Sequence, residues 1–183
     1  MRRATWRFAV LGLLAAAVCA GGVSYAGAAL LPAAARAETL PLFTIERSKN
    51  ANVVHYDARL DAGGKLYPKE PVIAYWIMLA EDGRREDLNW IEKNKAYGFD
   101  IKPDAAGNSY CLTVVSAPDR PITVKKAGEA VRAELVIDGR PAVLEKMYIN
   151  STDGLTGPKV NYIELHGKDI KTGEKRLEKI VPK

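Results

Sequence analysis

The sequence predicts a mainly β protein, an antiparallel β-barrel or sandwich with a meander-like strand order and one packed α-helix. After residue 38, short segments rich in β-branched and aromatic residues recur, separated by turns rich in Gly, Pro, Asn and Asp. Residues 52–60 alternate between apolar and polar side chains, which is typical of a half-buried strand. Only residues 85–98 have the start and stop signals of a helix. Many short strands at near-regular spacing favour a barrel or sandwich.

The N-terminus has the pattern of a secretory signal peptide. Arginines 2, 3 and 7 precede a charge-free stretch over residues 8–31, and Ala35-Arg36-Ala37 forms an A-x-A cleavage sequence. The apolar stretch is also long enough to span a bilayer, for which about 20 residues suffice. We therefore expect residues 1–37 to be a signal peptide, with an uncleaved N-terminal anchor as the alternative.

This interpretation predicts one β-rich domain over residues 38–183, located in the periplasm or secreted, or else anchored to the membrane at its N-terminus. The leader contains four of the 27 basic residues and none of the 22 acidic ones, so the rest of the chain is close to neutral. The basic character of the whole sequence therefore gives no reason to expect nucleic acid as a partner. A membrane contact is expected only through the leader, if it is not cleaved.

The first part of the domain is expected to form three strands and the helix. Residues 42–48 and 52–60 are the first two strands, and a Gly63-Gly64 turn follows them. Residues 71–80 are apolar on both faces and predict a central strand covered on both sides. In the helix over residues 85–98, Asp87 is the expected N-cap, Leu88 and Ile91 share a stripe, and Gly98 is the expected stop.

The second part of the domain is expected to consist of strands and hairpins. Four strand-like segments follow the helix, and residues 159–167 and 174–181 give two more. Asp138-Gly139 predicts a two-residue type I′ hairpin in which Ile137 faces Arg140. Continued alternation would place Leu135 opposite Ala142, Ala133 opposite Leu144, and Arg132 opposite Glu145. The alternation breaks beyond Glu145, which predicts a bulge or a change of environment there.

Three segments resemble a known family. They are "LFTIERSKNANVVHYD", "PVIAYWIM" and "EDLNWIEKNKAYGFDI", and together they resemble a bacterial family known as domain of unknown function 4833. The resemblance covers most of residues 42–166. It implies no activity, because none is established for the family.

The polar stretch 47–52 and nearby aromatic residues form the candidate ligand site. Arg47, Lys49, Asn50 and Asn52 offer a guanidinium fork, an ammonium group and amide donors and acceptors to an anionic or carboxylate-bearing ligand. The alternative is a charged turn between two strands. The complete set of candidate ligand-binding residues is Arg47, Lys49, Asn50, Asn52, His55, Tyr75 and Trp76.

The sequence provides little support for a metal or for catalysis. His55 with Asp57 and His166 with Glu164 have i, i+2 spacing, but no compact metal-binding motif is present, so we predict no metal and no cofactor. A Cys111–His166 nucleophile pair would require proximity in the fold, and Cys111 is expected to be a small core residue.

The preferred function is therefore a ligand-binding β-barrel module, with a small amphipathic or anionic, lipid-like molecule inside the barrel or at its mouth. A structural or protein-interaction domain of the cell envelope is the alternative. An envelope enzyme is the third possibility, and we do not assign the domain as an enzyme.

Overall fold

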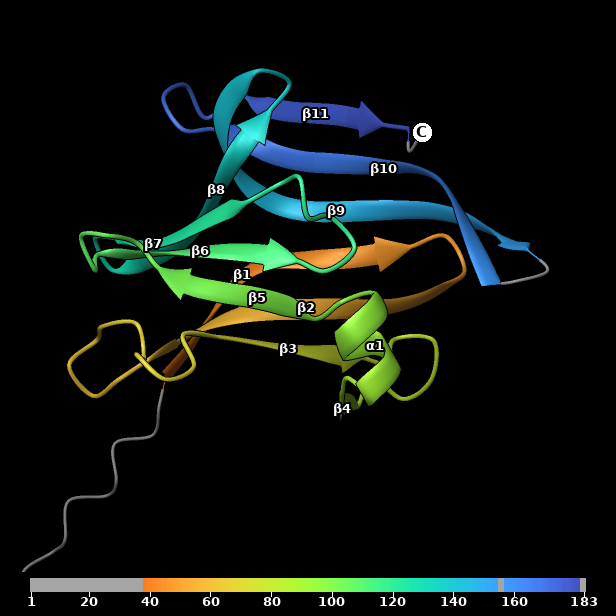
Figure 1. Ribbon diagram of the computed structural model, residues 1–183, viewed down its shortest axis with the longest axis horizontal. Helices are drawn as coiled ribbons and strands as arrows, with labels where there is room; N and C mark the ends of the chain where they lie inside the picture. The colour runs from red at the N-terminus through yellow and green to blue at the C-terminus, as the bar shows by residue number, and fades with distance from the viewer. Residues whose placement is uncertain (1–37, 155–156, 182–183) are drawn as a thin grey trace, which may run out of the picture. The chain divides into compact units, whose positions relative to one another are not determined.

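The computed structural model describes residues 38–154 and 157–181 (Figure 1). The predicted leader lies outside these residues. The elements are β1 (Glu38–Arg47), β2 (Asn50–Leu60), β3 (Val72–Ile77), β4 (Arg85–Asp87), α1 (Trp90–Lys95), β5 (Phe99–Pro103), β6 (Ser109–Val114), β7 (Ile122–Ala127), β8 (Ala130–Ile137), β9 (Arg140–Gly154), β10 (Gly157–Asp169) and β11 (Lys175–Ile180). The mainly β class with one short helix is confirmed.

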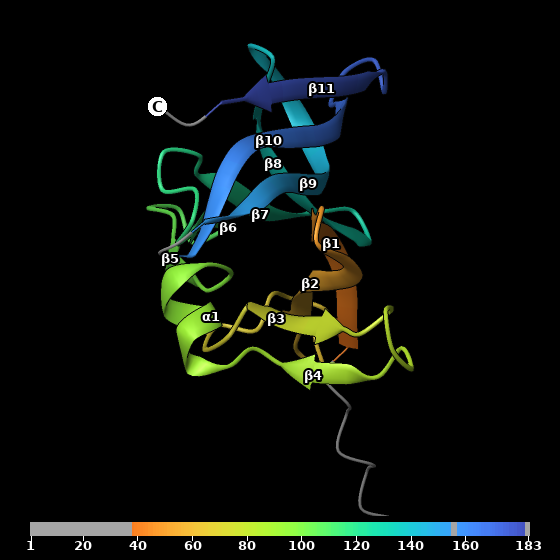
Figure 2. The ribbon, with the colours of Figure 1, turned by 90° about the vertical axis from the view of Figure 1, so that its right-hand side faces the viewer.

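All eleven strands belong to one mixed sheet that curls into a half-barrel. The strand order is β4-β3-β2-β1-β9-β8-β7-β6-β5, while β10 pairs with β9 and β11 pairs with β10. Figure 2 shows how the sheet turns so that β5 and β6 lie opposite β1 and β2. The ring centres of Tyr56 on β2 and Phe99 on β5 are 5.9 Å apart across the interior. One pair departs from the antiparallel pattern, because β1 and β9 are parallel.

Strand β9 is where the sheet forks. Its first residues pair with β8 as far as Val143, and residues Lys146 to Ile149 pair with β1, while β10 pairs along its other edge. The Asp138-Gly139 hairpin has the predicted register, and both turn residues have positive φ angles, 50° and 71°. The predicted pairs Ala133–Leu144 and Arg132–Glu145 are wrong, because the β8–β9 ladder ends at the pair of Glu134 with Val143.

The predicted irregularity near Glu145 is confirmed as a bulge. Leu144 pairs with Gly167 and Lys146 with His166, so Glu145 is the extra residue. A Cβ atom on Gly167 would lie 2.3 Å from the carbonyl oxygen of Val143. Only glycine allows β10 to approach β9 this closely where β9 bends.

The interior of the half-barrel is filled by side chains. Phe43 stacks on Tyr56 with ring centres 4.4 Å apart, and Tyr56 is completely buried. The Tyr56 hydroxyl donates to the carbonyl oxygen of Tyr97, and burial raises the pKa of Tyr56 well above its usual value. The core cluster lies entirely between Leu42 and Leu165, so the described domain has its own core. This packing leaves the surface hollows and the mouth of the half-barrel as places for a ligand.

Three local predictions are corrected. The strand predicted over residues 71–80 is shorter and lies next to the edge strand β4, and Ile73 and Ile77 are only half-buried. The predicted helix is limited to Trp90–Lys95, since residues 85–87 form β4. Cys111 is exposed, because Leu112 and Val114 occupy the buried face of β6.

Candidate functional site

The turn between β1 and β2 holds Arg47 in a fixed position. The Nε of Arg47 donates to the Oδ1 of Asn50 at 3.2 Å, and the same oxygen accepts from the backbone N–H of Asn52 at 3.2 Å. The Ser48 hydroxyl donates to the carbonyl oxygen of Ser151 and accepts from its N–H, both at 3.1 Å. The two Ser48 bonds attach the turn to β9. Asn50 thus has a role in positioning Arg47.

An aromatic side chain supports the Arg47 guanidinium. Its central carbon lies 4.6 Å from the centre of the Trp76 ring, which is a cation–π contact. Trp76 is only 4% exposed, and Tyr97 meets it edge-on with ring centres 5.1 Å apart. Because Trp76 is part of the core, it provides a rigid base for the arginine.

A groove of about 390 Å³ lies beside Arg47 at the mouth of the half-barrel. Ile45 and Met147 are in the core, and Arg47 and Ile149 follow them on the same face of β1 and β9. The lining residues are Arg47, Lys49, Ile91, Glu92, Lys95, Ala96, Tyr97, Ser116, Ile149, Ser151 and Val160. We call this site the mouth groove.

The mouth groove combines positive charge with apolar surface. Among the described residues that line it, Arg47, Lys49 and Lys95 are basic and Glu92 is acidic. A carboxylate oxygen of Glu92 accepts a hydrogen bond from the backbone N–H of Asn89 at 2.9 Å. This bond at the start of α1 partly offsets the negative charge of Glu92. The groove therefore matches a molecule that has an anionic group next to an apolar part.

The remaining predicted site residues lie elsewhere. Asn52 is 4% exposed; its Oδ1 accepts the N–H of Ala80 at 2.8 Å and its Nδ2 lies 3.5 Å from the Met78 sulfur. It therefore holds the turn after β3. His55 and Tyr75 lie on the outer face of the sheet, because Val54 and Trp76 occupy the inner face.

On that outer face, Tyr75 is the centre of a polar cluster. Its hydroxyl donates to the Oδ2 of Asp57 at 2.5 Å, and His55 stacks on its ring at 5.7 Å. The Arg85 guanidinium lies 3.6 Å from the ring centre. Burial, together with the bond to Asp57, raises the pKa of Tyr75 to about 12. Tyr75 therefore keeps its proton at neutral pH and acts as a hydrogen-bond donor.

The two histidines do not form a common site. His55 aligns with Thr44, Thr44 with Lys146, and Lys146 with His166. At about 4.8 Å per strand spacing, the histidine backbones are roughly 14 Å apart. His166 instead contacts Glu164 at 3.2 Å. Within residues 38–154 and 157–181, no group of three His, Cys, Asp or Glu side chains could hold a metal ion.

The suggested Cys111–His166 pair is also separated. Cys111 is on β6 and His166 on β10, with β7, β8 and β9 between them in the sheet. No nucleophile–base arrangement follows from these positions.

A larger hollow of about 660 Å³ lies between β3, α1 and β5. Its lining mixes both signs of charge, with Arg59, Arg85 and Lys93 beside Glu70 and Asp87. Arg59 is paired with Glu70. Because its charges are mixed, this hollow gives no clear preference for a ligand class.

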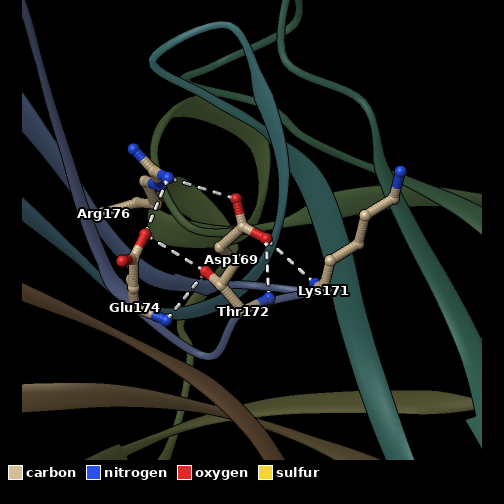
Figure 3. A network of polar contacts seen from close by, with 5 residues as sticks. All are labelled: Asp169, Lys171, Thr172, Glu174 and Arg176. Carbon is tan, nitrogen blue, oxygen red and sulfur yellow. Dashed lines mark hydrogen bonds and ion pairs between the residues drawn. The ribbon is translucent and has the colours of Figure 1, made fainter.

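Another polar network is structural (Figure 3). The Oδ1 of Asp169 accepts the N–H groups of Lys171 and Thr172 at 2.9 and 3.1 Å, and its Oδ2 lies 3.3 Å from Arg176. The N–H of Thr172, then that of Lys171, and the charge of Arg176 lower the pKa of Asp169. This network fixes the turn between β10 and β11.

The family comparison covers the chain from within β1 to within β11. A family model described as a domain of unknown function, DUF4833, matches residues 43–179. The chain belongs to this family. Searches of curated proteins and of solved structures found no match. The DUF4833 description names no activity, so the geometry of the mouth groove is the basis for a functional proposal. No helix among residues 38–154 and 157–181 is long and apolar enough to cross a membrane.

Proposed function

We propose that this DUF4833 domain binds a small amphipathic molecule with an anionic head group in the mouth groove. The observation that carries the proposal is the position of Arg47. Its guanidinium rests on Trp76 and its Nε is held by Asn50, while the groove beside it is partly apolar. A side chain held in this way loses little conformational freedom when a ligand binds.

In this proposal the two ends of the ligand have different contacts. The terminal nitrogens of Arg47 donate to the carboxylate or phosphate oxygens, and Lys49 and Lys95 add positive charge. The apolar part packs against Ile149 and Val160. The exported location expected from the leader is compatible with such a binding module and stays a prediction.

Calorimetric titration of the 38–183 domain with decanoate, kept below its micelle concentration, tests the proposal. We expect decanoate to bind, and decanol and decyltrimethylammonium to bind much more weakly. Loss of a charge-assisted hydrogen bond costs about 1.5–3 kcal/mol, so Arg47→Gln should weaken decanoate binding by at least about tenfold.

Arg132→Gln is the matched control, because Arg132 is exposed on β8 and does not line the groove. Circular dichroism should show that both variants are folded. The proposal is wrong if decanoate does not bind, or if the two arginine variants have the same affinity as the unmodified domain.

A further inference from the structure

Helix α1 exposes two large apolar side chains that the fold does not use. Trp90 is 73% exposed and Ile91 is 64% exposed, and no side chain of this helix is buried. Single exposed apolar side chains are common on protein surfaces, whereas neighbouring ones form an apolar patch, and such patches mark interaction sites. The pair therefore indicates a surface that contacts something else.

Two lysines lie on either side of this apolar pair. At about 100° per residue, the order around the outward side of the helix is Lys93, Trp90, Asn94, Ile91 and Lys95. Glu92 falls on the opposite side, where it forms the capping box with Asn89. The surface thus has two apolar side chains, one on either side of Asn94, and a lysine at each margin; apolar side chains flanked by lysines are a feature of helices that lie in a membrane interface.

The position of α1 in the fold keeps this surface accessible. In both ribbon views the helix lies outside the strands, and no other described element covers its outward side (Figures 1 and 2). Leu88, which is 4% exposed, anchors the chain before the helix. After the helix, a Cβ on Gly98 would lie 1.7 Å from the carbonyl oxygen of Lys93, so the close turn there requires glycine. The helix is thus held rigidly while its outer side stays exposed.

The size and charge of the surface favour a lipid bilayer over a protein partner. The six helical residues form a helix only about 9 Å long. Its surface is small beside the area of about 800 Å² that each partner buries in a stable protein interface. The strength of contact with an anionic bilayer scales with the inserted apolar area plus the attraction between basic side chains and lipid head groups, and this surface offers both. Arg47 and Lys49, across the mouth groove from α1, add positive charge at the same end of the domain.

We propose that α1 docks the domain on the surface of an anionic bilayer, with Trp90 and Ile91 among the head groups and Lys93 and Lys95 at lipid phosphates. Ile91 and Lys95 also line the mouth groove. The inference therefore deepens the proposed function by naming a bilayer as the source of the ligand, and it rests on that function for this point alone.

Tryptophan fluorescence of the 38–183 domain tests the docking. This domain contains only Trp76 and Trp90, and Trp76 is already buried, so a shift of the emission reports mainly on Trp90. Vesicles of phosphatidylcholine with 30% phosphatidylglycerol are the probe, and pure phosphatidylcholine vesicles are the control. We expect a blue shift and co-sedimentation with the anionic vesicles only, and both should weaken as salt is raised.

Variants then identify the surface. Trp90→Ala and the double variant Lys93→Gln/Lys95→Gln should each reduce the partition coefficient at least tenfold. Leu177→Ala and Lys102→Gln/Lys171→Gln are the matched controls, because these side chains are exposed on β11, on β5 and in the turn before β11, and none belongs to α1. They should change the partition coefficient less than twofold.

The outcomes separate this inference from the proposed function. Decanoate binding without vesicle binding overturns the docking and leaves the mouth groove as a ligand site. Vesicle binding that depends on Trp90, without decanoate binding, supports the docking and removes the groove proposal. Equal binding to neutral vesicles, or binding that Trp90→Ala does not change, overturns the docking.

Discussion

A substitution of Asn52 tests whether this residue of the polar stretch 47–52 has a structural role or a ligand-binding role. Its side chain is 4% exposed, and its Oδ1 accepts the N–H of Ala80 at 2.8 Å in the turn after β3. Asn52→Ala removes this hydrogen bond and the contact of the amide nitrogen with the Met78 sulfur. The variant should therefore destabilise the domain and leave the mouth groove intact.

The expected loss in the free energy of unfolding follows from the exposure of the two hydrogen-bond partners, Asn52 and Ala80. A net hydrogen bond contributes about 1 kcal/mol, and a buried donor left without an acceptor adds about 1–3 kcal/mol. Ala80 is exposed, so water can replace the lost acceptor, and the total should be at the low end, about 1–2 kcal/mol. In a domain of this size that lowers the Tm by roughly 2–8 °C.

Urea unfolding followed by circular dichroism measures this loss. Asn108→Ala is the control, because Asn108 is exposed in the turn before β6 and its truncation should cost less than about 0.5 kcal/mol. Decanoate affinity should change less than twofold in both variants. An Asn52→Ala domain as stable as the control would refute the structural role, and a selective loss of decanoate binding would return Asn52 to the ligand site.

Two further predictions concern an exposed thiol and a buried carboxylate. Cys111 should react with a thiol reagent such as Ellman's reagent almost as fast in the folded domain as in urea. Cys111→Ser should change the free energy of unfolding by less than about 0.5 kcal/mol. Protection of the thiol in the folded domain would contradict its outward position. Because the pKa of Asp169 is lowered in the folded state, its contribution to stability is present above the unfolded pKa of about 3.9 and is lost as pH falls through the folded pKa. Between pH 7 and pH 3 the unmodified domain should therefore lose more stability than Asp169→Asn in urea titrations, and an equal loss would contradict the network in Figure 3.

Local pattern was sufficient to predict most strands and one hairpin. The Asp138-Gly139 turn fixed the pairing of Ile137 with Arg140, because turn geometry sets the register of a short hairpin. The break in alternation after Glu145 likewise located the bulge. The predicted N-cap, Asp87, is wrong: Asn89 is the N-cap and forms the capping box with Glu92, although the sequence does contain their i, i+3 spacing.

The features that the sequence pattern could not predict depend on contacts between distant segments. Cys111 lies in a run that is apolar on both faces, so its period of two does not say which face is buried. Arg47 and Lys49 were recognised as candidates, but their meeting with Lys95 and Ile149 requires the parallel pairing of β1 with β9.

The parallel ladder between β1 and β9 also determines the order in which the chain can complete its sheet. The paired residues, such as Thr44 and Lys146, are about a hundred residues apart along the chain, whereas the hairpins from β5 to β11 join neighbours. At a synthesis rate of about 5–20 residues per second, the β9-facing edge of β1 has no partner for roughly 5–20 seconds after it is made. Throughout this interval β1 presents unpaired backbone groups that can join the strand of another chain. The contact that brings Arg47 beside Ile149, and so builds the mouth groove, is therefore among the last to form.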